Sequence, residues 1–386
     1  MRILIVHNLL WAHYKASVFE ALQQIVDQQP DVTLKVLQLA RNERSRAGME
    51  TDQAAPVYRY TYELLFDRFL EDVPVVERTR TLLRRVAAFK PDVINLTGYY
   101  DPAQVAVLLW ARARGIPVVM QNESTTADNR RGGWKETLKR RIIDLCSGFF
   151  CFGNRSADYL LSLGVPAHKI LLRKNAVDNR TIRQVYDQAL PTRPIRQQQL
   201  GLPPNNFIYI GRLIGIKNLP TLLDAFAQAR QLASAAPAWG LVLLGDGADR
   251  PALLGQVTRL GLADVVSIQA PMPWYRVPEL MALSNVLVLP SLSEPWGLVV
   301  NEAMVCGLPV LVSNQCGCVP DLVDDGQTGF VFDPNDVTAL AGHMADFMNN
   351  RVDVPAMRAA AERRIAPYAP EAVAREMLAG FRKVTA

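Results

Sequence analysis

The sequence has few of the features that mark metal-binding or disulfide-bonded proteins. Its 386 residues include only five cysteines and four histidines, with no CxxC pair and no His/Cys spacing typical of a zinc site. Cys316 and Cys318 lie too close together to form half of a zinc site without further partners. We therefore expect reduced cysteines, buried or in loops, as in a cytosolic protein, and no bound metal ion.

A large excess of one charge and a long apolar run are also missing. There are 42 basic and 37 acidic residues, and a net charge of only +5 argues against a strongly basic nucleic-acid-binding protein. No apolar run approaches the roughly 18 residues that span a bilayer. The first seven residues lead directly into a strand pattern without a signal-peptide cleavage site. We expect a cytoplasmic protein that binds no nucleic acid.

Short apolar runs alternate with helical patterns from the first residue onwards. Hydrophobic residues make up 49% of the chain, enough for two domains that each bury a core. The strands expected in the first half are 3–6, 34–39, 93–96, 117–120, 148–152 and 170–173. The helices expected there are 17–27, 77–89, 104–114 and 135–145. This alternation predicts right-handed βαβ units and a parallel sheet covered on both faces.

The same alternation restarts after a polar segment rich in Gln, Arg, Asn and Pro. We interpret 191–204 as a linker between an N-terminal domain, 1–190, and a C-terminal domain, 205–366. The strands expected in the second half are 207–210, 240–244, 265–269, 286–289, 310–312 and 329–332. The helices expected there are 219–231, 250–260, 276–282, 298–306 and 337–349, with a last helix at 371–384. The predicted fold is α/β, with two doubly wound Rossmann-like domains facing a central cleft at the carboxyl ends of their strands.

Two acids flank a helix start in the segment 294–313. The pattern predicts a helix beginning at Gly297, whose first amides, from Gly297, Leu298 and Val299, are free to donate to a phosphate. Glu302 follows at about 7.5 Å along the helix, near the distance from a diphosphate to its ribose hydroxyls. Its carboxylate suits a vicinal diol, and Glu294 lies where an attached sugar would be. The alternative is two solvent-facing acids around a helix cap.

A glycine-containing loop follows the first strand of the second half. Gly211 lets the backbone approach a ligand, and Arg212 and Lys217 can converge on a diphosphate. The loop is not a Walker motif, because the GxxxxGK[ST] spacing is absent. On its own, it is also compatible with an ordinary solvated loop. Gly245-Asp246-Gly247 after the next strand is more typical of a turn than of a ligand contact.

Together these motifs resemble the signature of retaining GT-B glycosyltransferases of glycosyltransferase family 4, also called glycosyl transferase group 1, over about residues 205–335. The resemblance implies transfer of a sugar from a nucleotide diphosphate sugar, with no metal and no cofactor beyond this co-substrate. A UDP-sugar is favoured. It implies that the last helix, 371–386, crosses back to the first domain. The residues that the family pattern assigns to donor binding are Gly211, Arg212, Lys217, Met272, Glu294, Gly297, Leu298, Val299 and Glu302.

The first half departs from the family pattern. Many members carry a glycine pair after the first strand, where this chain has His7 to Tyr14, and a histidine after the fourth strand that contacts the donor sugar. Here Asn122 or Glu123 stands in the latter position and is a candidate for that contact or for general acid–base catalysis. The alternative is a turn or cap. A front-face retaining mechanism needs no nucleophile from the enzyme, so the missing histidine does not exclude activity.

Four residues of the first half are candidates for binding an acceptor. Tyr99 follows the third strand and can stack on a sugar or pack in a loop, and His13 is a polar contact or a structural residue. Arg130 and Arg131 suit an anionic acceptor. The basic amphipathic segment 130–142 fits peripheral contact with an anionic membrane, or else a solvated face on a core-packing helix.

These observations favour a retaining glycosyltransferase that moves a sugar to a glycan, glycolipid or small-molecule acceptor held by the first domain. Domain closure would exclude water from the reaction. Two alternatives share the same architecture. One is a nucleotide-sugar 2-epimerase, and the other is a non-catalytic protein that binds nucleotide sugars.

Overall fold

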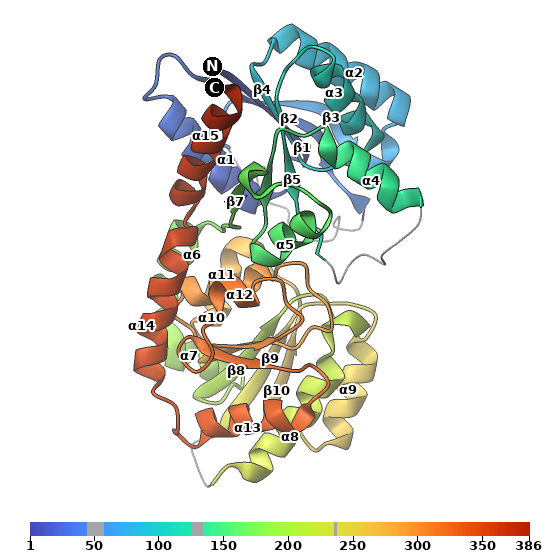
Figure 1. The fold of residues 1–386 in the computed structure, drawn as a ribbon. Helices are drawn as coiled ribbons and strands as arrows, with labels where there is room; N and C mark the ends of the chain where they lie inside the picture. Colours follow the sequence, from blue (N-terminus) through green and yellow to red (C-terminus); the bar gives the residue numbers. More distant parts are fainter. Residues whose placement is uncertain (45–57, 126–133, 235–237) are drawn as a thin grey trace. The chain divides into compact units, whose positions relative to one another are not determined.

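The computed structural model describes residues 1–44, 58–125, 134–234 and 238–386. They divide into two compact units, which Figure 1 shows as a ribbon. Unit 1 comprises Met1–Asp178 together with Tyr368–Ala386, and unit 2 comprises Asn179–Pro367. Among the described residues, no helix has both the length and the hydropathy needed to cross a bilayer.

Unit 1 is built on a seven-stranded sheet in which all paired strands run parallel. Its strands are β1 (Arg2–Leu9), β2 (Thr33–Asn42), β3 (Tyr62–Phe69), β4 (Val93–Leu96), β5 (Val118–Asn122), β6 (Gly148–Cys151) and β7 (Ile170–Arg173). They lie in the order β3-β2-β1-β4-β5-β6-β7, so the strand order reverses between β1 and β4. In open parallel sheets, ligands bind beyond the carboxyl ends of the strands at such a reversal.

Helices cover both faces of the unit 1 sheet. They are α1 (His13–Val26), α2 (Val75–Phe89), α3 (Pro102–Arg112), α4 (Trp134–Asp144), α5 (Asn154–Ser162) and α15 (Pro370–Thr385). On one face, α1 and α15 pack together, with Phe19, Leu22 and Phe381 fully buried in one apolar cluster. On the other face, a second cluster joins the sheet to α2 and α3 through Leu82, Val86 and their neighbours. The last helix of the chain therefore completes the core of unit 1.

Unit 2 repeats this plan with six parallel strands. They are β8 (Asn205–Ile210), β9 (Trp239–Leu244), β10 (Val266–Gln269), β11 (Val286–Leu289), β12 (Val310–Ser313) and β13 (Gly329–Phe332). The spatial order is β10-β9-β8-β11-β12-β13, with the reversal between β8 and β11. The four residues of β11 are all buried, as expected for a strand covered on both faces.

The helices of unit 2 include several that the sequence pattern did not reveal. They are α6 (Asn179–Ala189), α7 (Arg193–Gln199), α8 (Leu219–Leu232), α9 (Arg250–Arg259), α10 (Val277–Met281), α11 (Leu298–Val305), α12 (Val319–Leu322), α13 (Val337–Met348) and α14 (Val354–Ile365). Short 3₁₀ helices occur at η5 (Leu190–Thr192), η6 (Gly215–Lys217), η7 (Trp274–Arg276) and η8 (Ala366–Tyr368). Of these helices, α6, α7, α12 and α14 were not expected.

The segment 191–204 is not the linker that its composition predicted. It contains α7, and unit 2 begins at residue 179 instead of residue 205. Gln197 is buried and donates from Nε2 to the carbonyls of Pro204 and Leu283 at 3.0 and 2.9 Å. Arg193 donates to Asn285 Oδ1 at 2.7 Å. Polar side chains that suggested a solvated linker, such as Arg193 and Gln197, instead form hydrogen bonds within unit 2.

The close pairing of β12 and β13 gives a test of the fold. Gly329 has a φ of +156°, and a Cβ atom there would overlap the carbonyl oxygen of its partner Val310. Gly329→Ala should therefore destabilise unit 2 by about 2 kcal/mol or more, because strand backbone has to move. Calorimetric thermal unfolding of the full chain measures this loss.

Gly342→Ala is the matched control, because Gly342 lies within α13 and a Cβ there meets no atom within 4 Å. Alanine is favoured in a helix interior, so this variant should be neutral or stabilised by up to about 1 kcal/mol. Equal melting temperatures for the two variants would contradict the described register of β12 and β13.

Candidate functional site

The loops that follow β8 and β11 meet at the strand reversal of unit 2. The Lys217 ammonium, at the end of η6, forms an ion pair with the Glu294 carboxylate from the β11 loop. The two side chains are only 14% and 18% exposed. The sequence predicted both residues in one site, and the structure brings them into direct contact. Each therefore neutralises the charge of the other.

The loop that carries Arg212 and Lys217 is fixed by its close approach to the β9 loop. The Leu213 amide donates to the Asp246 carbonyl at 2.8 Å, and the Asp249 amide donates to the Leu213 carbonyl at 3.0 Å. A Cβ atom at Gly245 or Gly247 would overlap the backbone of residues 211–213. These two glycines thus allow a close backbone contact between the two loops.

The β11 loop leads into α11 through a glycine in a left-handed conformation. Gly297 has a φ of +100° and precedes the first helical residue, Leu298, as predicted. The loop is anchored by the Gly317 amide, which donates to the Glu294 carbonyl at 2.8 Å, and by the Trp296 indole, which donates to Asn301 Oδ1 at 2.8 Å. As at any helix start, the amides of the first turn have no acceptor within the helix and are suited to an anion.

Glu302 lies one turn further along α11 and differs from Glu294 in its surroundings. It is partly exposed, yet burial still raises the pKa of its carboxyl to about 7. Within the described parts of the chain, no hydrogen bond to this carboxyl group is found. An enclosed acid of this kind is stabilised by a ligand that donates hydrogen bonds to it.

The remaining donor-site candidates lie on the same edge of the sheet. Arg212 is exposed directly after Gly211, and the described residues offer it no ion pair. Met272 lies three residues after the end of β10, and the Gln269 carbonyl accepts from the Gly245 amide at 3.1 Å. The strands β10, β9, β8 and β11 are neighbours in the parallel sheet, so the loops that follow them lie at one edge of it.

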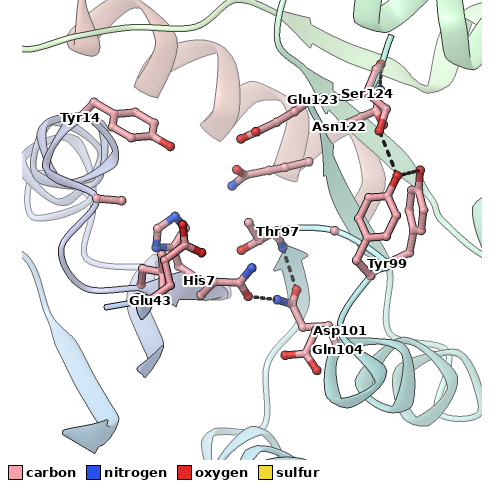
Figure 2. A pocket seen from close by; sticks show the side chains of 16 residues that line it. His7, Tyr14, Glu43, Thr97, Tyr99, Asp101, Gln104, Asn122, Glu123 and Ser124 are labelled. Atoms are coloured by element: carbon pink, nitrogen blue, oxygen red, sulfur yellow. Dashed lines mark hydrogen bonds between the residues drawn. The ribbon is translucent and has the colours of Figure 1, made fainter. Parts of the chain in front are cut away.

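Unit 1 has a cavity of about 230 Å³ at its own strand reversal. The cavity is lined by residues at the end of β1 and after β1 and β4, joined by Glu43 after β2 and by Gln121 to Ser124 at the end of β5. Figure 2 shows Tyr14 and Glu123 on opposite sides, with their oxygen atoms directed into the open space. We refer to it below as the unit 1 pocket.

Several polar side chains beneath the unit 1 pocket are bonded to one another. Gln104 accepts from the Thr97 amide at 2.8 Å and donates to Asn8 Oδ1 at 2.5 Å (Figure 2). His7 is buried and lies 3.0 Å from Gln38 Oε1 through Nδ1. Because Gln38 donates its amide hydrogen to the Tyr60 hydroxyl at 2.9 Å, its Oε1 accepts and His7 Nδ1 carries the proton.

The two candidates at the end of β5 have different environments. The Asn122 amide donates to Ser156 Oγ at 2.7 Å and to the Ser124 carbonyl at 3.1 Å, while Ser156 Oγ donates back to the Asn122 carbonyl. Its amide group therefore fixes the β5 loop. Glu123 is exposed and lines the unit 1 pocket. The structure thus places Glu123, and not the amide of Asn122, where a ligand can reach it.

Tyr99 also lines the unit 1 pocket, next to the more exposed Tyr100. The rings of Tyr99 and Tyr100 are 4.6 Å apart at 36°, and Tyr100 is 75% exposed. Lys139 is buried beneath them, 5.0 Å from the Tyr99 ring, and it contacts the Tyr159 hydroxyl. Burial raises the pKa of Tyr99 well above its usual value.

Lys15 is a buried group that sequence reasoning missed. It lies in the first turn of α1 and is 7% exposed, with its Nζ 3.6 Å from the centre of the Phe152 ring and 3.4 Å from Asn175 Oδ1. Burial lowers the pKa of its ammonium to about 8, although the Glu123 carboxylate raises it. The partners lie far apart in the sequence, so no local pattern reveals this buried lysine.

The structure describes the other first-half candidates only in part. His13 is the first residue of α1, and Arg130 and Arg131 lie outside the described residues. In the described part of 130–142, Lys139 is buried, Ile142 packs against the unit 1 core, and Leu138 is 51% exposed. All five cysteines fall within the described residues, and each is buried and free of disulfide bonds.

Two family models match the chain, one for each half. The model described as "Glycosyl transferases group 1" matches residues 192–366, and the model described as "Glycosyltransferase Family 4" matches residues 18–180. Together with the two Rossmann-like units, these matches place the chain in the glycosyltransferase families that they describe, with the GT-B fold.

Curated relatives match in part. A D-inositol 3-phosphate glycosyltransferase from Streptomyces scabiei is 33% identical over 223 residues, which are 54% of this chain and 49% of the relative. An alpha-maltose-1-phosphate synthase from Mycolicibacterium smegmatis is 30% identical over 203 residues, which are 49% of this chain and 51% of the relative. The chain thus spans about half the length of the curated relatives that it matches.

Solved structures match over nearly the whole chain. Anabaena Alr3699/HepE, crystallised in complex with UDP, has a TM-score of 0.73 at 19% identity and covers 99% of this chain and 100% of its own. The lipopolysaccharide outer core galactosyltransferase WaaB in its apo form has a TM-score of 0.71 at 16% identity, covering 99% of each chain. At these identities the likeness supports the fold alone.

The buried Lys15 predicts a pH-dependent stability. Its pKa is about 8 in the folded protein and 10.5 when unperturbed, so the unfolded chain binds more protons between these values. The free energy of unfolding of the wild type should therefore rise with pH in this window, relative to Lys15→Met, by up to about 3 kcal/mol. Urea unfolding at a series of pH values measures the difference.

The matched control is Lys383→Met, which removes an exposed lysine of the same unit. Its stability relative to the wild type should be independent of pH across the same window. A pH-independent difference for Lys15→Met would show that the lysine keeps its ordinary affinity for protons.

Proposed function

We propose that the protein is a retaining glycosyltransferase that transfers a sugar from a nucleotide diphosphate sugar to a hydroxyl group of an acceptor. Unit 2 binds the donor through the loops after β8 and β11 and the start of α11. Unit 1 binds the acceptor in the unit 1 pocket. Membership in the two glycosyltransferase families and the arrangement of charged groups in unit 2 support this assignment.

The observation that carries the proposal is the contrast between the two acids of unit 2. Glu294 is already paired with Lys217, whereas Glu302 is an enclosed carboxyl with a raised pKa and no described hydrogen-bond partner. A ribose diol donates two hydrogen bonds and suits Glu302. A diphosphate suits Lys217, Arg212 and the amides of Gly297 to Val299, so its arrival would draw Lys217 from Glu294 and leave Glu294 to face the sugar.

The proposed reaction breaks one bond and forms one. The acceptor oxygen bonds to the anomeric carbon on the face from which the diphosphate departs, and the bond between that carbon and the diphosphate oxygen breaks. The acceptor's proton passes to the departing phosphate oxygen. Arg212, Lys217 and the α11 amides stabilise the negative charge that develops on the diphosphate, and Glu294 stabilises positive charge on the sugar. These cations take the place that a metal ion would otherwise fill.

A UDP-sugar is the proposed donor. The likeness to Anabaena HepE, which was crystallised with UDP and with UDP-glucose, makes UDP the first nucleotide to test. The backbone around Met272, after β10, is the proposed contact for the base edge. Calorimetric titration with UDP, GDP and ADP, followed by product analysis with the sugar of the preferred nucleotide, tests both donor and reaction.

Substitution of Glu302 and of Glu294 should change different kinetic constants. Glu302→Ala should raise the KM for the donor by about 10- to 100-fold, since a hydrogen bond to a charged group contributes roughly 1.5–3 kcal/mol. Glu294→Ala should depress kcat more than KM, because its interaction strengthens as charge develops on the sugar. Steady-state kinetics with varied donor separates the two effects.

Asp264→Ala provides the control, because Asp264 is an exposed acid of unit 2 that precedes β10 and lies outside the loops after β8 and β11. It should leave both constants unchanged. Small and equal effects from all three variants would mean that Glu294 and Glu302 are ordinary surface acids. An epimerised sugar formed from the donor alone would indicate a 2-epimerase, and tight donor binding without turnover would indicate a binding protein.

The raised pKa of Glu302 predicts that donor binding depends on pH, which gives a separate test of the site. Below pH 7 its carboxyl becomes protonated in the free protein and loses acceptor capacity, so the donor should bind best above pH 7. The affinity of the wild type for UDP, relative to Glu302→Gln, should fall by about tenfold as the pH is lowered through 7. The titration of UDP itself affects both proteins equally and cancels in the ratio of their affinities. A ratio that does not change with pH would contradict the role of Glu302.

A further inference from the structure

We propose that Tyr209 is a positioning residue of unit 2, whose hydroxyl group fixes the backbone at Arg212 and thereby sets the direction in which the Arg212 guanidinium reaches the diphosphate. Gly211 belongs to the same device, because the Tyr209 hydroxyl occupies the space that a side chain at position 211 would need. This role rests on the proposed function, since it takes Arg212 as a residue that binds the diphosphate.

The Tyr209 side chain carries a buried hydroxyl that needs a hydrogen-bond partner. Tyr209 lies near the end of β8 and is fully buried. Its hydroxyl donates to the Arg212 carbonyl at 2.9 Å. Burial raises the pKa of this hydroxyl well above its usual value, and the charge of Glu294 raises it further. The hydroxyl therefore keeps its proton at neutral pH and remains a donor to Arg212.

The peptide group between Arg212 and Leu213 is held at both of its polar atoms. Its amide, from Leu213, donates to the Asp246 carbonyl at 2.8 Å, and its carbonyl, from Arg212, accepts from the Tyr209 hydroxyl. Because a peptide group is planar, two hydrogen bonds to its opposite atoms fix its orientation. No other described residue donates to the Arg212 carbonyl. The orientation of this peptide group thus depends on Tyr209.

Arg212 needs such support more than Lys217 does. The Lys217 ammonium is already held by Glu294, whereas Arg212 is exposed and the described residues offer it no ion pair. A long, exposed side chain loses conformational freedom when it binds an anion. A fixed backbone limits the directions that the Arg212 side chain can take, and so reduces this cost. The effect of Tyr209 on diphosphate binding should therefore pass through Arg212.

Glycine at position 211 is required beside the tyrosine hydroxyl. Gly211 has a φ of +154°, and a Cβ atom there would lie 2.7 Å from the Tyr209 hydroxyl oxygen and 3.2 Å from the ring carbon Cζ. The first distance is shorter than a non-bonded contact allows, and the buried ring has little room to move. The pattern at this strand end therefore pairs a tyrosine at 209 with a glycine at 211.

The first test measures affinity for UDP by calorimetric titration, or for GDP or ADP if one of these binds more tightly, in Tyr209→Phe, Arg212→Ala and the double variant of the full chain. Tyr209→Phe removes only the hydroxyl and should weaken nucleotide binding by about fivefold in the wild-type background. In the Arg212→Ala background it should change the affinity by less than about twofold, because the side chain that it positions is absent. A tyrosine with a merely structural role would act equally in both backgrounds.

Tyr186→Phe is the matched control, because Tyr186 is another buried tyrosine of unit 2, whose hydroxyl accepts from Arg358 at 2.6 Å. It should leave the nucleotide affinity unchanged in both backgrounds. Equal effects of Tyr209→Phe in the two backgrounds, or no effect in the wild-type background, would overturn the role of Tyr209 and leave the proposed function standing. Failure of the wild type to bind UDP, GDP and ADP would contradict the proposed donor site and this role together.

The second test concerns Gly211 and needs no nucleotide. Gly211→Ala should lower the melting temperature of the full chain, and the loss should be smaller by about 3 °C or more in the Tyr209→Phe background. The strain of alanine at this φ is common to both backgrounds and cancels, so the difference measures the contact with the hydroxyl. Equal losses in the two backgrounds would overturn the requirement for glycine beside Tyr209.

Discussion

The close contact between the β8 and β9 loops is the constraint on which the arrangement of charged residues in unit 2 depends. Side chains at Gly245 and Gly247 would overlap the backbone of residues 211–213, so their absence lets two loops pack main chain against main chain. Two backbone hydrogen bonds then fix Leu213. A loop held in this way carries Lys217 to Glu294 on the β11 loop. Charged groups held in fixed positions stabilise charge that develops in a reaction, which is the role we propose for Lys217.

The same strand reversal carries different side chains in the two units. In unit 2, the loops beyond β8 and β11 carry Lys217 paired with Glu294, the start of α11, and Glu302 with its raised pKa. In unit 1, the described lining of the pocket includes Glu43 and Glu123, while Lys139 is enclosed by aromatic rings and Arg78 pairs with Asp101. The fold supplies the position at the strand reversal, and a few loop residues determine the chemistry found there.

Sequence patterns predicted those elements that are buried along their whole length, because a continuous apolar run in the sequence reveals them. The strands of unit 2 were expected because runs such as β11 are buried on both faces. β3 was missed because an edge strand keeps polar residues such as Asp67. The helix α7 was mistaken for a linker because its polar residue Gln197 is buried and forms hydrogen bonds inside unit 2. Glu294 and Glu302 could be recognised because they lie in one short segment. Lys15 and Gln121 could not, because their environments are formed by residues distant in the chain.

The packing of α15 in unit 1 has a consequence for how the protein is made. Val373, Met377 and Phe381 fill the same apolar cluster as β1 and α1, so residues on both sides of unit 2 in the sequence share one core. Unit 2 is continuous in the chain and has its whole sequence available on the ribosome before α15 is made. Until α15 emerges, this face of the unit 1 sheet lacks part of its cover, and exposed apolar surface of this kind is what chaperones recognise. Synthesis therefore favours completion of unit 2 before unit 1.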